Sequence, residues 1–257
     1  MPVLFFGHGS PMNAIEENEF VSGWRNIGKT LPEVKAILCI SAHWETRGTY
    51  VTSSENPATI HDFRGFPEEL FNIRYPAPGS PELAREIQNN ISKVNVNLDE
   101  KWGLDHGCWS VIKHLYPEAN ISVVQLSLDY TRDAEFHYEL SKELASLRRK
   151  GVLIIGSGNI VHNLRLLDWN KMNHDNFGFD WAIEANDKMK KFILEDNHRQ
   201  LIEYRKQGRA FELAIPTPEH YLPLLYVLAL KEKNEVVTFF NDKAVGGSLT
   251  MTSLKIA

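Results

Sequence analysis

The segment KAILCISAHW, residues 35–44, decides how the fold is interpreted. Its apolar run, residues 36–40, is too short to span a membrane and is rich in branched side chains, as is typical of a buried strand in a parallel sheet. The run leads directly into Ser41, Ala42 and His43, so a histidine stands where the strand delivers its carboxyl end. Ligands of open α/β sheets bind at that edge. The segment therefore predicts a functional histidine at the edge of a sheet.

Three more histidines follow the same pattern. Apolar residues 2–6 run into Gly7 and His8, residues 151–155 lead through GSGN to His162, and His220 follows a proline-bounded turn. Glycine and proline neighbours let the backbone approach a ligand and hold the rings in place. If the first two strands are parallel neighbours, His8 and His43 lie side by side. We predict that His8, His43, His162 and His220 share a metal site.

Length and composition exclude several classes of protein. The 257 residues are 43% hydrophobic and show no linker-like division, so we expect one domain over residues 1–257. The net charge of −5, with both signs interspersed, argues against a nucleic-acid or anionic-membrane partner. No run of about 18 apolar residues and no signal-like N-terminus is present, so a cytoplasmic location is expected. Cys39 and Cys108 are too few for a disulfide framework.

Strand-like and helix-like segments alternate along most of the chain. Helical periodicity is expected over residues 14–30, 131–148 and 180–195, and two strands, 235–240 and 248–255, close the sequence. This order predicts an α/β fold with a central, largely parallel sheet flanked by helices on both faces. The last strands are candidates for antiparallel pairing.

A long loop, residues 56–81, is rich in proline and aromatic residues. Long loops inside compact domains are usually functional, and this one is too apolar for a disordered linker. We interpret it as a lid or pocket wall. His61 and Phe66 from this loop, together with Trp44, are the candidates for lining an apolar substrate pocket.

The remaining histidines are weaker candidates. His106 stands at an expected helix start, where it is either a catalytic acid or base or an ordinary residue of the capping turn. His114, His137 and His198 are expected at the surface of helices. The spacing of the histidines matches no compact metal motif such as HExxH.

Several motifs together nevertheless resemble a known family. GHGSP at residues 7–11, SAHW at 41–44, GLDHG at 103–107, GSGNIVHNL at 156–164 and TPEHYLPL at 217–224 stand in the order seen in the 4,5-DOPA extradiol dioxygenases. These are class III, LigB-like ring-cleavage dioxygenases, and the similarity covers essentially the whole chain. The resemblance implies a single-domain α/β fold, a non-haem Fe(II) cofactor often replaced by zinc, and cleavage of a catechol by O2 next to its two hydroxyls.

The resemblance also implies roles for individual residues. His8, His43 and His220 correspond to metal ligands, His162 to a fourth ligand or an acid/base beside the metal, and His106 to a catalytic histidine. Better-studied relatives bind iron through two histidines and a glutamate. Here the matching positions are all histidine, so either iron or zinc suits the site.

Two alternatives use the same histidines. A zinc-dependent hydrolase would activate water at the metal, and a closed, four-coordinate site would make the protein a non-catalytic metal-binding module. The leading prediction is a dioxygenase that takes O2 and a small, DOPA-like catechol. The sequence predicts no particular oligomeric state.

Overall fold

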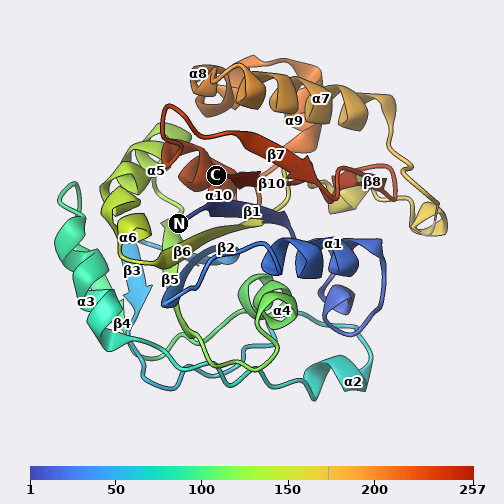
Figure 1. Ribbon diagram of the computed structural model, residues 1–257. Coiled ribbons are helices and arrows are strands. Elements are labelled where there is room, and N and C mark those ends of the chain that lie inside the picture. Colours follow the sequence, from blue (N-terminus) through green and yellow to red (C-terminus); the bar gives the residue numbers. More distant parts are fainter. Residues whose placement is uncertain (173) are drawn as a thin grey trace.

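The computed structural model describes residues 1–172 and 174–257 and shows a central sheet with helices on both faces (Figure 1). Among the described residues, eight strands form this sheet in the order β4-β3-β5-β2-β6-β1-β10-β7. The predicted α/β fold with a largely parallel sheet is confirmed. The strands are β1 (Val3–Gly7), β2 (Ala36–Thr46), β3 (Thr49–Thr52), β4 (Val96–Asp99), β5 (Ser122–Asp129), β6 (Val152–Gly158), β7 (Val237–Phe240) and β10 (Ser253–Ile256), with β8 (Ala244–Val245) and β9 (Leu249–Thr250) forming a separate pair.

The centre of the sheet is parallel and its closing edge is antiparallel. β6 pairs in parallel with both β1 and β2, and β10 pairs antiparallel with β1 and β7, as expected for the last strands. One prediction is wrong: β1 and β2 are not neighbours, because β6 lies between them. Parallel strands are joined by crossovers and need not follow chain order. The carboxyl ends of β1 and β6 meet at one edge, because Gly7 pairs with Gly158. β2 pairs with β6 up to Ser41 and Ser157 at that edge but continues to Thr46, so His43 lies within the strand, beyond its pairing with β6, and not at its carboxyl end.

Alternation along the buried strands explains the two layers of helices. Successive side chains of a strand point to opposite faces. Leu4 and Phe6 of β1 therefore join one buried cluster, which includes Trp24 and Trp109, whereas Val3 belongs to the other. The helices are α1 (Glu19–Gly28), α2 (Glu68–Phe71), α3 (Pro81–Asn90), α4 (His106–Leu115), α5 (Ala134–Ser141), α6 (Ala145–Arg149), α7 (Asp180–Leu194), α8 (His198–Ile202), α9 (Arg209–Ala214) and α10 (Leu222–Ala229).

Two expected helices are shorter than their periodicity suggested. The expected helix over residues 14–30 begins only at Glu19, where Asn18 caps it, and a 3-10 turn precedes it. The expected helix over residues 131–148 is divided into α5, a 3-10 turn and α6. None of the helices in the described part of the chain is long and apolar enough to cross a membrane.

The start of α4 is fixed by a buried carboxylate. Asp105 caps the helix by accepting a hydrogen bond from the backbone N of Cys108 at 3.1 Å. Its side chain also accepts hydrogen bonds from Ser41 and from the Gln125 amide, both at 2.6 Å. A buried carboxylate is tolerated when its oxygens are satisfied in this way. The network ties the first residue of α4, His106, to the edge of the sheet.

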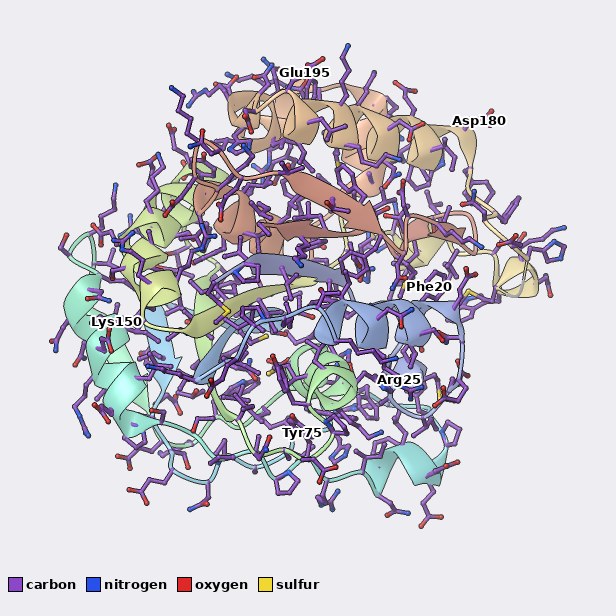
Figure 2. The ribbon with its side chains drawn as sticks, in the orientation of Figure 1. Phe20, Arg25, Tyr75, Lys150, Asp180 and Glu195 are labelled. Carbon is purple, nitrogen blue, oxygen red and sulfur yellow. The ribbon has the colours of Figure 1, made fainter. Side chains whose placement is uncertain are left out.

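The aromatic loop is ordered and attached to α4. It contains the short helix α2, and Trp109 donates its indole N–H to the carbonyl O of Ile60 at 2.8 Å. Tyr75, which lies near α4 in Figure 2, donates its hydroxyl to the carbonyl O of Tyr116 at 2.8 Å. Buried aromatic rings therefore hold this loop against the body of the protein.

Two of the three histidines expected at the surface are buried, and the third is half-buried. His114 is buried and contacts the carbonyl O of Asn13 at 2.8 Å, whereas His198 is half-buried and contacts the Tyr138 hydroxyl at 2.8 Å. His137 is fully buried between α5 and α10. The expectation failed because helices pack on one another as well as on the sheet: α1 and the turn before it cover His114, and α10 lies against His137.

Candidate metal centre and active site

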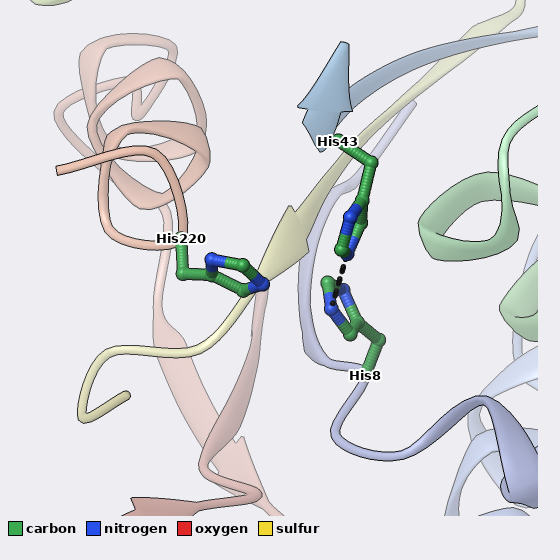
Figure 3. Close-up of side chains that lie close together, drawn as sticks. All are labelled: His8, His43 and His220. Carbon is green, nitrogen blue, oxygen red and sulfur yellow. Dashed lines mark hydrogen bonds between the residues drawn. The ribbon is translucent and has the colours of Figure 1, made fainter. Parts of the chain in front are cut away.

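Three histidines from distant parts of the chain form a compact triangle (Figure 3). The ring centroids of His8 and His43 lie 5.0 Å apart, those of His8 and His220 5.3 Å, and those of His43 and His220 5.0 Å. One ring nitrogen from each residue lies within 4.8 Å of the others, and the Nε2 atoms of His8 and His43 are 3.1 Å apart. This spacing allows a single ion to contact all three.

A polar partner holds the outer nitrogen of each ring. The Nδ1 atom of His8 contacts the Ser157 hydroxyl at 2.9 Å, and that of His220 contacts Glu219 at 3.1 Å. The Nδ1 atom of His43 lies 3.3 Å from Asp62. Partners of this kind fix the orientation of metal-binding imidazoles and leave Nε2 available. The donor set therefore fits a divalent metal ion of the type that imidazole ligands select, including iron and zinc.

Burial keeps these ligands in the form that binds metal. It is the largest cause that lowers the pKa of His8 and of His43 well below the usual range, and the neighbouring histidines lower both further. Burial also lowers the pKa of His220, although Glu219 opposes this effect. A metal ion binds the neutral imidazole, so these rings need to release no proton at neutral pH.

His106 stands directly beside the triangle. Its ring centroid is 3.9 Å from that of His43 and 5.7 Å from that of His8. Its Nδ1 contacts a carboxylate oxygen of Asp62 at 2.9 Å, and its backbone N donates to the other oxygen at 2.8 Å. Burial works to raise the pKa of Asp62, but the hydrogen bonds from His106 outweigh it and leave the pKa lowered. Asp62 is thus an anion facing two histidines.

His162 lies on the other side of the triangle. Its ring stacks on that of His220, with centroids 3.5 Å apart and planes 8° from parallel. It groups with Glu219 and His220 rather than with His8 and His43 as a set of potential ligands. Burial lowers the pKa of His162 to about 3, and His220 contributes to the shift. This arrangement places a neutral imidazole beside the three-histidine set.

The histidines open into a cavity of about 420 Å³ whose remaining lining is mainly apolar but includes Arg64 and Ser10. Phe63 and Phe66 of the aromatic loop contribute to one wall. The segment after β6 contributes Leu164, Trp169 and Met172. An apolar cleft with a few convergent polar groups is typical of a small-molecule site.

Two residues expected in the pocket lie elsewhere. Trp44 is buried outside the lining of this cavity and stacks on Trp102 at 5.6 Å. The reason is strand geometry: His43 faces the cavity, so the next residue of β2 points to the opposite face. His61 is also outside the lining; its Nε2 contacts the carbonyl O of Ile73 at 3.1 Å, and its ring packs against the loop's own aromatic residues.

Sequence reasoning missed the residues that hold the histidines. Ser157 and Glu219 lie inside quoted motifs and Asp62 follows His61, but nothing in the sequence indicated that their side chains contact the rings. It also missed Trp169, whose side chain stands at the mouth of the cavity and is 72% exposed. The apolar residues that follow the GSGN turn were the one feature of the sequence that could have predicted this wall of the cavity.

The family of this chain follows from comparison with known sequences. Residues 2–247 match the family described as the catalytic LigB subunit of aromatic ring-opening dioxygenase. The match covers almost the whole chain, so the protein belongs to this family and is an enzyme of the ring-opening dioxygenase class. Enzymes of this family use a non-haem metal, which the histidine centre could hold, and the family implies an aromatic substrate and O2 as reactants.

Named relatives and a solved structure agree with this assignment. The chain is 45% identical to the 4,5-DOPA dioxygenase extradiol of Escherichia coli K12, over 100% of this chain and 94% of the relative. It is 37% identical to the protein of the same name from Beta vulgaris, over 98% and 95% of the two chains. A crystal structure of an uncharacterized protein from Escherichia coli K12 superposes over both full chains with a TM-score of 0.86 and 41% identity. Neither a zinc hydrolase nor a closed metal-binding module is favoured.

Proposed function

We propose that this protein opens a small, DOPA-like catechol next to its two hydroxyls, with residues 1–257 acting as one catalytic domain and Fe(II) as the working metal. The single observation that carries the proposal is the triangle of His8, His43 and His220 at the base of an apolar cavity. The names of the relatives supply the DOPA-like substrate. Zn(II) is the other ion that this donor set would hold.

The chemistry divides between the metal and the protein. When bound to the three histidines, Fe(II) supplies the Lewis acidity and the redox capacity that ring opening by O2 requires. The protein binds the flat ring between Phe66 and the segment that carries Trp169, and it keeps bulk water from the reacting edge.

The two remaining histidines are suited to proton transfer. Asp62 accepts a hydrogen bond from Nδ1 of His106, so the lone pair of His106 lies on Nε2, the atom positioned to take a proton from a catechol hydroxyl. His162 stands across the site against His220. Because it is a neutral imidazole, it would first take a proton released by a catechol hydroxyl, and it is the candidate for returning that proton during ring opening. We therefore assign His162 as the acid/base rather than as a fourth ligand.

A second cavity supports a substrate with a side chain. It measures about 640 Å³ and shares Phe66, Trp169 and Met172 with the catalytic cavity. It carries charged groups of both signs, among them Glu16 and Lys243, whereas the catalytic cavity has Arg64 as its charged side chain besides the histidines. A ring held at the histidines could extend a polar substituent into this space, as an amino-acid side chain on a catechol requires.

Anaerobic reconstitution tests the proposal. The protein would be loaded with Fe(II), mixed with L-DOPA or catechol and exposed to air, while O2 uptake and the visible absorbance of a ring-opened semialdehyde are recorded. We expect stoichiometric uptake with a yellow product, and loss of both in His43→Ala. Iron-loaded protein that consumes no O2 across a panel of catechols would refute the assignment.

A further inference from the structure

A single carboxylate connects the metal triangle to the proton-transfer histidine. Asp62 comes from the aromatic loop, far in sequence from the strands and helices that carry the histidines. The backbone side of this residue is open to solvent, but its side chain is only 17% exposed and points toward the histidines. The same oxygen, Oδ2, lies 2.9 Å from Nδ1 of His106 and 3.3 Å from Nδ1 of His43.

We propose that Asp62 is a positioning residue that orients the metal ligand His43 and the proton-transfer residue His106 at once. The inference rests on the proposed function, because it takes His106 as the base in ring opening. A carboxylate only accepts hydrogen bonds, so His106 presents an N–H at Nδ1 to it. The Asp62 anion, 3.3 Å from Nδ1 of His43, likewise favours the tautomer of His43 that carries its proton on Nδ1. Both rings therefore carry their free lone pair on Nε2: that of His43 serves the metal, and that of His106 serves the substrate.

The third contact of Asp62 fixes the distance between these two rings. Oδ1 accepts the backbone N–H of His106, the first residue of α4, at 2.8 Å. The carboxylate is thus held at the start of a ten-residue helix, where the helix dipole favours an anion. Because the other oxygen faces both rings, a movement of Asp62 would displace His43 and His106 together. The loop that walls the cavity thereby supports the reacting groups as well.

The discriminating variant is Asp62→Asn, which keeps the size of the side chain and removes its charge. The amide is uncharged and offers one acceptor oxygen, so it cannot reproduce the two hydrogen bonds from His106 together with the contact to His43. Loss of such a partner typically weakens metal binding about 10- to 100-fold. We expect the dissociation constant for Co(II) to rise by about tenfold or more, with a changed visible spectrum of the bound Co(II) before any substrate is added.

A second effect should appear in turnover. At saturating Fe(II), we expect kcat of Asp62→Asn to fall by about tenfold or more, with the KM for the catechol changed much less, because His106 loses its orientation. In a His106→Gln background the Asp62 substitution should lower kcat no further, while its effect on Co(II) affinity persists. If Asp62 only supported the fold, its substitution would lower kcat by the same factor in the wild-type protein and in the His106→Gln variant. Glu69→Gln, the same loss of charge on the exposed surface of the same loop, is the matched control.

Each outcome decides the proposal. Wild-type Co(II) affinity together with wild-type kcat in Asp62→Asn would overturn it, and a kcat fully restored by saturating metal would remove the link to His106. If the Asn variant does not fold, Asp62→Glu keeps the charge but displaces the oxygens, and we expect it to show both losses. If the wild-type protein opens no catechol, the proposed function fails, while the Co(II) measurements still decide whether Asp62 supports His43.

Discussion

Acidification should destabilise this protein in part through one buried histidine remote from the metal centre. His137 is fully buried, and its Nε2 lies 3.2 Å from the carbonyl O of Asp129, which only accepts. Nε2 therefore carries the proton, and Nδ1 accepts from the Tyr226 hydroxyl at 2.9 Å. A second proton would make this ring a buried cation without water to solvate it. Burial therefore lowers the pKa of His137 to about 4.

The direction and size of the effect follow from linkage. The ordinary pKa of histidine is 6.5. Between pH 6.5 and about pH 4, this side chain is therefore mostly protonated in the unfolded chain but mostly neutral in the folded protein. Stability contributed by neutral His137 is therefore complete above pH 6.5 and declines as the pH falls toward 4. The full difference corresponds to about 3 kcal/mol, of which about 2 kcal/mol is lost between pH 7 and pH 5.

Chemical denaturation measures this contribution. Free energies of unfolding from urea titrations at pH 7 and pH 5 would be compared for the wild type and His137→Gln, which retains one donor and one acceptor but does not titrate. Other buried histidines affect both proteins equally, so the difference isolates His137. We expect the loss on acidification to be smaller in the variant by about 2 kcal/mol. Equal losses in the two proteins would refute the reasoning.

Further predictions concern the active site. His162→Ala should retain its metal, measured as metal content after dialysis, but lose about 10²- to 10⁴-fold in kcat; loss of the metal would show that His162 is a ligand. A chelator should abolish ring opening, which Fe(II) should restore to the wild type but not to His220→Ala, as O2 uptake would reveal. Trp169→Ala should raise the KM for L-DOPA several-fold more than that for unsubstituted catechol, because the residue borders the second cavity. Equal changes for the two substrates would argue against a side chain in that cavity.

Local patterns were sufficient to predict the elements that carry the site. The apolar runs before His8 and His43 predicted buried strands, and the structure places these runs in β1 and β2. A helix was expected to start at His106, and α4 begins there, with Asp105 as its cap. Such signals are readable because strand burial and helix capping depend on residues within a few positions of one another.

The order of strands was not readable in the same way. Chain order suggested that β1 and β2 are neighbours, yet β6 separates them. Helix faces were similarly ambiguous, since His137 looked like a surface residue until α10 covered it. Both errors concern which element packs against which, and that is decided by contacts between residues far apart in the chain, such as His137 and Tyr226, which are 89 positions apart.

The sequence by itself determined that this is an α/β protein with histidines gathered at one edge of a parallel sheet. The reason is that short apolar runs that end in glycine or histidine are typical of buried strands that lead into turns at a ligand-binding edge. Only the tertiary structure decided which nitrogen each ring presents, that His162 lies beside the triangle, and that Trp44 turns away from the cavity. The nitrogen that each ring presents depends on Asp62, Glu219 and Ser157, of which Asp62 and Ser157 reach the rings from other segments of the chain. A hydrogen bond of about 3 Å between distant segments leaves no periodic trace in the sequence.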